Sequence, residues 1–113
     1  MKRTLEADRA AAELSMAVVG YACAVDVAAI ASANRGAAHV AFARQVSMYL
    51  THVAFELSLS RVAVAFGRDR STVGYACHLV EDRRDDPTFD QWLAQLESLL
   101  RHAPRRELGR LAA

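Results

Sequence analysis

Five consecutive residues, Arg68-Asp69-Arg70-Ser71-Thr72, gather two guanidinium groups, a carboxylate and two hydroxyls. These groups match the hydrogen-bonding edges of a DNA duplex: an arginine can donate twice to a guanine, a carboxylate can accept from a cytosine amine, and hydroxyls can bond a base or a phosphate. A charged run is also common at the solvated end of a helix. The elements around these residues have to decide between the two interpretations.

The flanking sequence predicts two short helices joined by a tight turn. Ser58 has the position and chemistry of an N-cap for a helix over residues 59–66, which Gly67 can end in the left-handed backbone conformation. Asp69 is expected to cap the next helix by accepting an amide from residue 71 or 72, a bond that stabilises a helix by about 1 kcal/mol. Such a pair predicts a helix-turn-helix, whose second helix places its first residues in the major groove.

The second of these helices is expected to bury one face and expose the other. At helical spacing the core face consists of Val73, Ala76, Cys77 and Val80. The opposite face consists of Ser71, Tyr75, His78 and Asp82, with Gly74 beside them. Gly74 would let a backbone approach closely. Tyr75 fits a DNA contact and an ordinary half-buried tyrosine equally well, and His78 is by default a surface histidine.

The rest of the chain predicts an all-α fold, a compact bundle of about six helices in a single domain over residues 1–103. Further helices are expected over residues 5–23, from an N-cap at Asp26 to about residue 33, from His39 onward, and from Pro87 to Pro104. Residues 34–36 are expected to form a loop. Residues 104–113, interrupted by proline and glycine, are expected to form a flexible tail.

Two of these helices carry apolar stripes. In the helix that begins at His39, the stripe expected in the core consists of Phe42, Val46, Tyr49, Leu50 and Val53, and the residues expected to project from the other side are Arg44, Met48 and Thr51. In the last helix, which Asp86 should cap, the stripe consists of Phe89, Trp92, Leu93, Leu96, Leu99 and Leu100. The last stripe can pack on the same core or form a face for self-association or a partner, because two heptads are too few to specify a coiled coil.

Composition narrows the classes of function. The formal net charge is only +1, so nucleic-acid binding has to be argued from distribution: residues 34–80 hold five arginines against two acids. The four histidines and two cysteines show neither metal-ligand spacing nor a nucleophile-base arrangement, which predicts no enzyme, no metal and no cofactor.

The cysteines and the apolar segments indicate the cellular compartment. Reduced thiols are expected in a bacterial cytoplasm, and no segment is long and apolar enough for a bilayer. A signal peptide is disfavoured because acids precede the first apolar stretch.

The segments ARQVSMYL (43–50) and LSLSRVAVAFGRDRSTVGYAC (57–77) resemble the C-terminal DNA-binding domain of the bacterial chromosomal replication initiator DnaA, and the likeness extends over about residues 18–97. The resemblance implies that Arg44 and Gln45 lie near DNA backbone and bases, and that Arg68, Asp69, Ser71 and Thr72 belong to the recognition helix. No Walker A glycine loop is present in this sequence, so the initiator's ATPase is not implied.

This sequence departs from the family pattern at three places. First, one glycine of a Gly-Gly pair is missing before Arg68. Second, two histidines of the family are replaced, by Arg70 and Tyr75. Third, a basic loop is reduced to the single arginine Arg35. Losing phosphate contacts should flatten the salt dependence of binding by about 0.9 log unit per contact. A lone domain is therefore expected to bind DNA with modest affinity. A homodimer or a partner is expected to restore high affinity.

Two functions follow from these observations. The first is sequence-specific binding of double-stranded DNA by a small transcription regulator that works with a partner. The second is an adaptor that keeps the fold but acts by protein contact, on the replication initiator, its regulators or RNA polymerase. The DNA-binding residues expected are Arg35, Arg44, Gln45, Arg61, Arg68, Asp69, Arg70, Ser71, Thr72, Gly74, Tyr75 and His78.

Overall fold

The computed structural model describes residues 2–104, which fold into six helices with no strand among them. The helices are α1 (Lys2–Cys23), α2 (Val27–Ala31), α3 (Ala38–Ala54), α4 (Leu59–Phe66), α5 (Arg70–Arg83) and α6 (Pro87–Arg101). The predicted all-α fold of about six helices is confirmed. The tail prediction for residues 105–113 lies outside the described residues.

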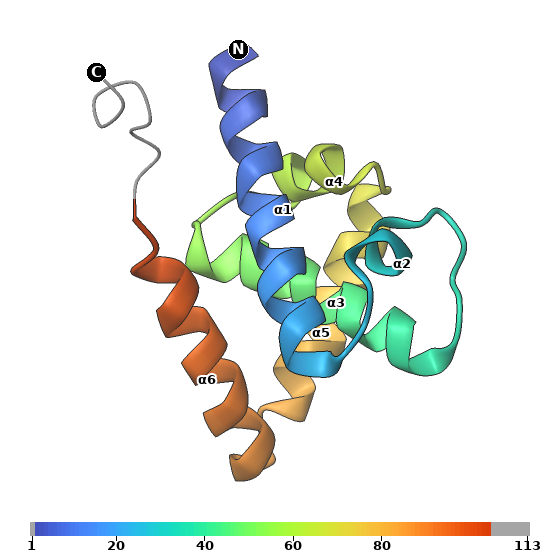
Figure 1. The fold of residues 1–113 in the computed structure, drawn as a ribbon, viewed down its shortest axis with the longest axis vertical. Helices are drawn as coiled ribbons and strands as arrows, with labels where there is room; N and C mark the ends of the chain where they lie inside the picture. Colours follow the sequence, from blue (N-terminus) through green and yellow to red (C-terminus); the bar gives the residue numbers. More distant parts are fainter. Residues whose placement is uncertain (1, 105–113) are drawn as a thin grey trace.

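Helix α3 is the centre of the fold and touches all five other helices, which surround it in Figure 1. Its Val46 and Leu50 are fully buried, together with Ile30 of α2 and Leu93 of α6. A second cluster on the other side of α3 joins Met48 to α4 and α5. The bundle is therefore wrapped around one helix.

This central position corrects the prediction for α3. Arg44, Met48 and Thr51 were expected to project away from the core, yet all three are buried. Periodicity placed one apolar stripe correctly, but α4 and α5 cover the opposite side as well. Thr51 is satisfied inside the core because its Oγ1 donates to the carbonyl of Ser47 at 2.7 Å.

The predicted helix ends are mostly confirmed. The hydroxyl of Ser58 accepts from the amide of Arg61 at 3.2 Å, the Asp86 carboxylate accepts from the amide of Thr88 at 3.1 Å, and Gly67 ends α4 at φ +64°. Asp69 and Asp26 occupy N-cap positions but make no side-chain capping bond, so that part of the prediction is wrong. The Asp69 carboxylate is left exposed to solvent.

Helix α6 packs mainly on α3 and also contacts α1. Phe89, Leu93 and Leu100 are buried, and the Trp92 ring lies 5.7 Å from the Phe89 ring. The core interpretation of this stripe is confirmed for these residues. Leu99 differs, because 56% of its surface is exposed.

Candidate nucleic-acid interface

Helices α4 and α5 form the predicted helix-turn-helix. Val62 and Ala63 of α4 pack against Val73 and Ala76 of α5 in one buried cluster. The turn between them is closed by a hydrogen bond from the amide of Arg68 to the carbonyl of Ala63 at 2.9 Å. The left-handed residue that this turn needs is supplied by a single glycine.

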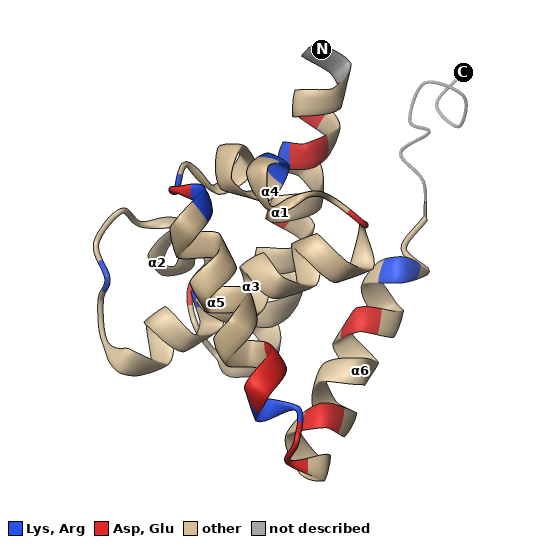
Figure 2. Cartoon of the chain, turned by 180° about the vertical axis from the view of Figure 1, so that it is seen from behind, with Lys and Arg blue, Asp and Glu red and all other residues tan. Residues whose placement is uncertain are grey.

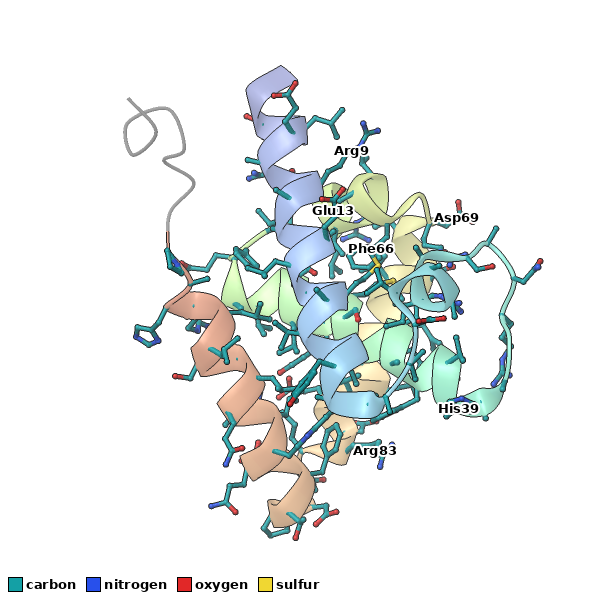
Figure 3. The ribbon with its side chains drawn as sticks, viewed as in Figure 1. Arg9, Glu13, His39, Phe66, Asp69 and Arg83 are labelled. Atoms are coloured by element: carbon teal, nitrogen blue, oxygen red, sulfur yellow. The ribbon has the colours of Figure 1, made fainter. Side chains whose placement is uncertain are left out.

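The first turn of α5 points into solvent. The exposed residues are Asp69 at the cap, Arg70, Ser71 and Thr72 in the first turn, and Tyr75 and His78 in the turns that follow. Tyr75 is 64% exposed, which corrects the half-buried alternative for this residue. Helix α6 packs against α3 and α1, so it does not cover this turn. Arg83 lies at the opposite end of α5 from Asp69 (Figure 3).

Charge is divided along α5. Figure 2 shows two basic residues around one acid at its start, and acids followed by basic residues at its far end. His78 faces Asp82 one turn later, with 3.3 Å between Nε2 and the carboxylate oxygen. The N-terminal half of α5, whose free amides also favour an anion, is therefore the half suited to a phosphate backbone.

Arg44 is not free on this surface. It is only 6% exposed, and its guanidinium lies among backbone carbonyls at the end of α2 and in the loop that follows. Nε donates to Ile30 at 2.7 Å, and Nη1 donates to Arg35 at 3.0 Å. Nη2 donates to Ala29 at 2.9 Å and to Asn34 at 3.1 Å. The expectation that Arg44 lies on phosphates conflicts with this geometry, because four of its five N–H groups are already used.

Arg68 and Arg61 are also engaged within the fold. Arg68 donates Nη1 to the carbonyl of Ala33 at 3.3 Å and Nη2 to the carbonyl of Ser32, while its Nε is buried without a partner. Arg61 forms a bidentate pair with Asp8, at 2.9 Å from Nε and 2.7 Å from Nη2. Arg68 is half-buried, whereas Arg61 stays exposed although its charge is paired.

A shallow hollow of about 240 Å³ lies between the loop, α3 and α5. The predicted site residues that line it are Arg35, Arg44, Gln45, Arg68, Thr72 and Tyr75. Arg35 is exposed at its rim and makes only a hydrogen bond of 3.3 Å to the carbonyl of Gly36. The structure thus brings together the loop, the start of α3 and the first turns of α5, whereas Arg61 lies outside the hollow.

The hollow is electropositive. Desolvation by burial lowers the pKa of Arg44, and the neighbouring charges of Arg68 and Arg35 lower it further. Within residues 2–104, none of these three guanidinium groups forms an ion pair with a carboxylate. No carboxylate therefore neutralises this cluster, and Arg35 is the member that is exposed to an approaching anion.

Gly74 lies on the flank of α5 that faces α4. A Cβ built there would lie 3.7 Å from Cδ1 of Leu59, an ordinary van der Waals contact. Packing does not require glycine at this position.

The part of the chain that is described contains no group of three or more His, Cys, Asp or Glu residues able to hold a metal ion. None of the described helices is long and apolar enough to span a bilayer.

The sequence matches the family model of the bacterial DnaA protein helix-turn-helix over residues 13–80. The chain belongs to the bacterial DnaA helix-turn-helix family. The match covers α4, α5 up to residue 80 and all the residues that line the hollow, so the family model and the geometry agree on the helix-turn-helix. A helix-turn-helix of the DnaA type is a DNA-binding module and not a catalytic domain.

Relatives and a solved structure agree with the DnaA assignment. The chain is 34% identical to the chromosomal replication initiator protein DnaA of Tropheryma whipplei (strain Twist) over 70 residues, 60% of this chain and 15% of that protein. It is 35% identical to DnaA of Microcystis aeruginosa over 86 residues, 74% of this chain and 19% of that protein. The crystal structure of a DNA replication initiation factor matches with a TM-score of 0.78 at 29% identity, covering 88% of this chain and 31% of that one.

One partner residue has no signal in the sequence. Asp8 is buried on α1, 53 residues before the arginine that it pairs with. Its neighbours are alanines and charged residues in an ordinary helical run. Only the packing of α1 against α4 shows that the charge of Arg61 is already compensated.

Proposed function

We propose that this domain binds double-stranded DNA sequence-specifically by inserting the first turn of α5 into the major groove. The main support is that the start of α5 is exposed to solvent while the helix is fixed by packing against α4. The exposed residues there are Asp69, Arg70, Ser71 and Thr72. In this arrangement Arg70 forks onto a guanine, and the hydroxyls bond phosphate or base. Arg35 contacts a phosphate from the rim of the hollow.

The free carboxylate of Asp69 supports direct reading of bases. Because it makes no capping bond, both of its oxygens can accept from a cytosine amine. Tyr75 and His78 continue the exposed line along α5, so they come next after the first turn on a duplex. Gln45 lies in the hollow beside this line.

The test begins with selection of duplexes from a random pool and measurement of affinity by fluorescence anisotropy over a series of salt concentrations. Arg70→Ala should relax the preference at one base pair and cost about 1–3 kcal/mol at the selected site. Arg35→Ala should weaken all duplexes alike and lower the salt slope by about 0.9. Arg101→Ala on α6 is the matched control, because it removes the same charge, paired there with Glu97, from a helix that does not cover the first turn of α5. Wild-type protein that selects no sequence would overturn the proposal.

We further propose that the domain regulates transcription on the bacterial nucleoid, in the cytoplasm, together with a partner or a second copy. Of the five arginines in residues 34–80, three (Arg44, Arg61 and Arg68) donate to groups within the fold. A lone domain therefore has few arginines left for phosphate contacts. A second DNA-binding unit would supply the missing contacts. Chromatin immunoprecipitation with sequencing should then show sharp recurrent sites at promoters. Sites confined to a replication origin would contradict a role in transcription.

The same scarcity of free cations favours a second candidate, an adaptor that acts through protein contact on replication initiation or on RNA polymerase. An uncharged hollow of about 450 Å³ between α1 and α6, which includes Tyr21 and Leu99, offers such a contact. A protein recovered by crosslinking with no enriched DNA would support the adaptor. Enriched DNA that is lost with Arg70→Ala would reject it.

A further inference from the structure

Two arginines bind the backbone that leads from α2 to α3. Arg44 comes from α3 and Arg68 from the turn of the helix-turn-helix, and their guanidinium groups together donate to six carbonyl oxygens. The accepting residues are Ala29, Ile30, Ser32, Ala33, Asn34 and Arg35. We call these two arginines and residues 29–35 the loop clamp.

We propose that Arg44 and Arg68 are positioning residues for DNA binding: they hold the Arg35 loop in one conformation beside the first turn of α5 and do not themselves hydrogen-bond to DNA. The inference rests on the proposed function, in which α5 and Arg35 contact one duplex. In this view the clamp holds Arg35 and the first turn of α5 in the relative positions that binding one duplex requires.

The loop has little else to order it. Residues 32–37 lie between two helices, most of them exposed, and α2 ends after only five residues. Besides the clamp, the loop side chains contribute one bond from the Asn34 amide to the Ser32 hydroxyl at 3.2 Å and one from Arg35 to the carbonyl of Gly36. Without the clamp, a loop so weakly tied would sample several conformations, and only a fraction of them would place Arg35 next to α5.

The alternative role for Arg44, a phosphate ligand, requires its guanidinium to leave these carbonyls. It would abandon bonds of 2.7–3.1 Å in a site where it is only 6% exposed. The buried carbonyls would lose their partners, which is unfavourable unless water replaces the arginine. The geometry therefore favours a role within the fold.

Lysine separates geometry from charge at these positions. A lysine keeps the positive charge that attracts a phosphate backbone, but its ammonium is a point donor and cannot span four carbonyls as a planar guanidinium does. If the charge is what matters, lysine should substitute well. If the clamp matters, lysine should fail although the local charge is unchanged.

The experiment compares Arg44→Lys and Arg68→Lys with Arg101→Lys, a control on α6. In the free protein, ¹⁵N relaxation should show order parameters of residues 32–36 falling from about 0.85 to below about 0.6 in the clamp variants only. If the competent loop conformation falls to about a tenth of the population, the Kd for the selected duplex rises about ten-fold, and the salt slope stays the same. Adding Arg35→Ala to Arg44→Lys should then weaken binding less than Arg35→Ala does alone.

Each other result overturns the inference. Clamp variants that bind like the wild type, or a loop that stays ordered in both of them, would show that the clamp does not position Arg35. A salt slope lowered by about 0.9 in Arg44→Ala, with Arg44→Lys binding like the wild type, would instead identify Arg44 as a phosphate ligand. Arg68→Lys serves where Arg44→Lys does not fold, because Arg68 is less buried. If wild-type protein binds no duplex, the proposed function fails too, whereas wild-type binding with unaffected variants rejects the clamp alone.

Discussion

At the scale of the residue, the same side-chain type serves opposite purposes in this domain. Arg35 and Arg70 are exposed, whereas Arg44 is buried among backbone carbonyls. Arg83 has its guanidinium carbon 4.6 Å from the centre of the Phe42 ring and 4.7 Å from that of Phe89, so it joins α5 to both α3 and α6. The role of each arginine follows from the oxygens and rings around it and not from its charge.

Gly74 gives a prediction at this scale. Gly74→Ala should stabilise the free protein by about 0.5–1 kcal/mol, because alanine favours a helix interior and its Cβ fits beside Leu59. If the DNA backbone approaches α5 closely there, the same change should weaken DNA binding. Thermal unfolding and anisotropy on one preparation measure both effects. Unchanged affinity would show that DNA does not approach Gly74.

At the scale of the element, partly buried polar groups join the helices that apolar contacts bring together. The Tyr49 hydroxyl of α3 donates to Glu81 of α5 at 2.6 Å and accepts from Arg84 at 2.9 Å. Arg84 also reaches Asp90 and Glu97 of α6. This network fixes the far end of α5, so the end that faces solvent starts from a rigid base.

The Tyr49 network predicts a dependence of stability on alkaline pH. Burial, followed by the hydrogen bond to Glu81, raises the pKa of Tyr49 to about 12 from the ordinary value of 10.0. The folded state therefore favours the protonated phenol, and this contribution is complete below pH 10 and is lost as the pH rises toward 12. Urea unfolding of the wild type should show this loss, and Tyr49→Phe should show less of it. Cys77, with its pKa raised to about 11 by burial, titrates nearby, so the comparison is made in a Cys77→Ala background.

The ion pair between α1 and α4 gives a second prediction at this scale. Asp8→Asn should lower the Tm, because it removes the buried negative charge and one of the two oxygens that accept from Arg61. It should also free the charge of Arg61 and raise affinity for all duplexes at low salt. Glu13→Gln, on an exposed position of the same helix, is the control. An unchanged Tm would show that the pair does not hold α1 on α4.

At the scale of the whole molecule, the proposed DNA-binding surface and the exposed apolar residues lie on different helices. The first turn of α5 is built on α4 and α3, whereas Tyr21, 91% exposed, and Leu99 lie along α1 and α6. No charged side chain lines the hollow between them. Two copies could therefore meet there without opposing like charges.

This surface gives a prediction that separates core from interface. Trp92→Ala should destabilise the domain, because the ring packs on the core beside Phe89. Leu99→Arg should change the free energy of unfolding by no more than about 0.5 kcal/mol, as for other surface changes. The same change should abolish any dimer. Light scattering and thermal unfolding measure the two properties. A Leu99→Arg dimer would place the contact elsewhere.

The sequence alone determined the helices, the capping serine, the glycine turn and the outward face of α5, because these depend on residues a few positions apart. It also determined the family, since the motif residues are contiguous. Tertiary structure alone decided which arginines are free. The partners of Arg61 and Arg44 lie 53 and up to 15 residues away, and a helical wheel cannot show that α3 is covered on both sides. Long-range packing places a carboxylate or a row of carbonyls next to a guanidinium, and local patterns carry no record of that placement.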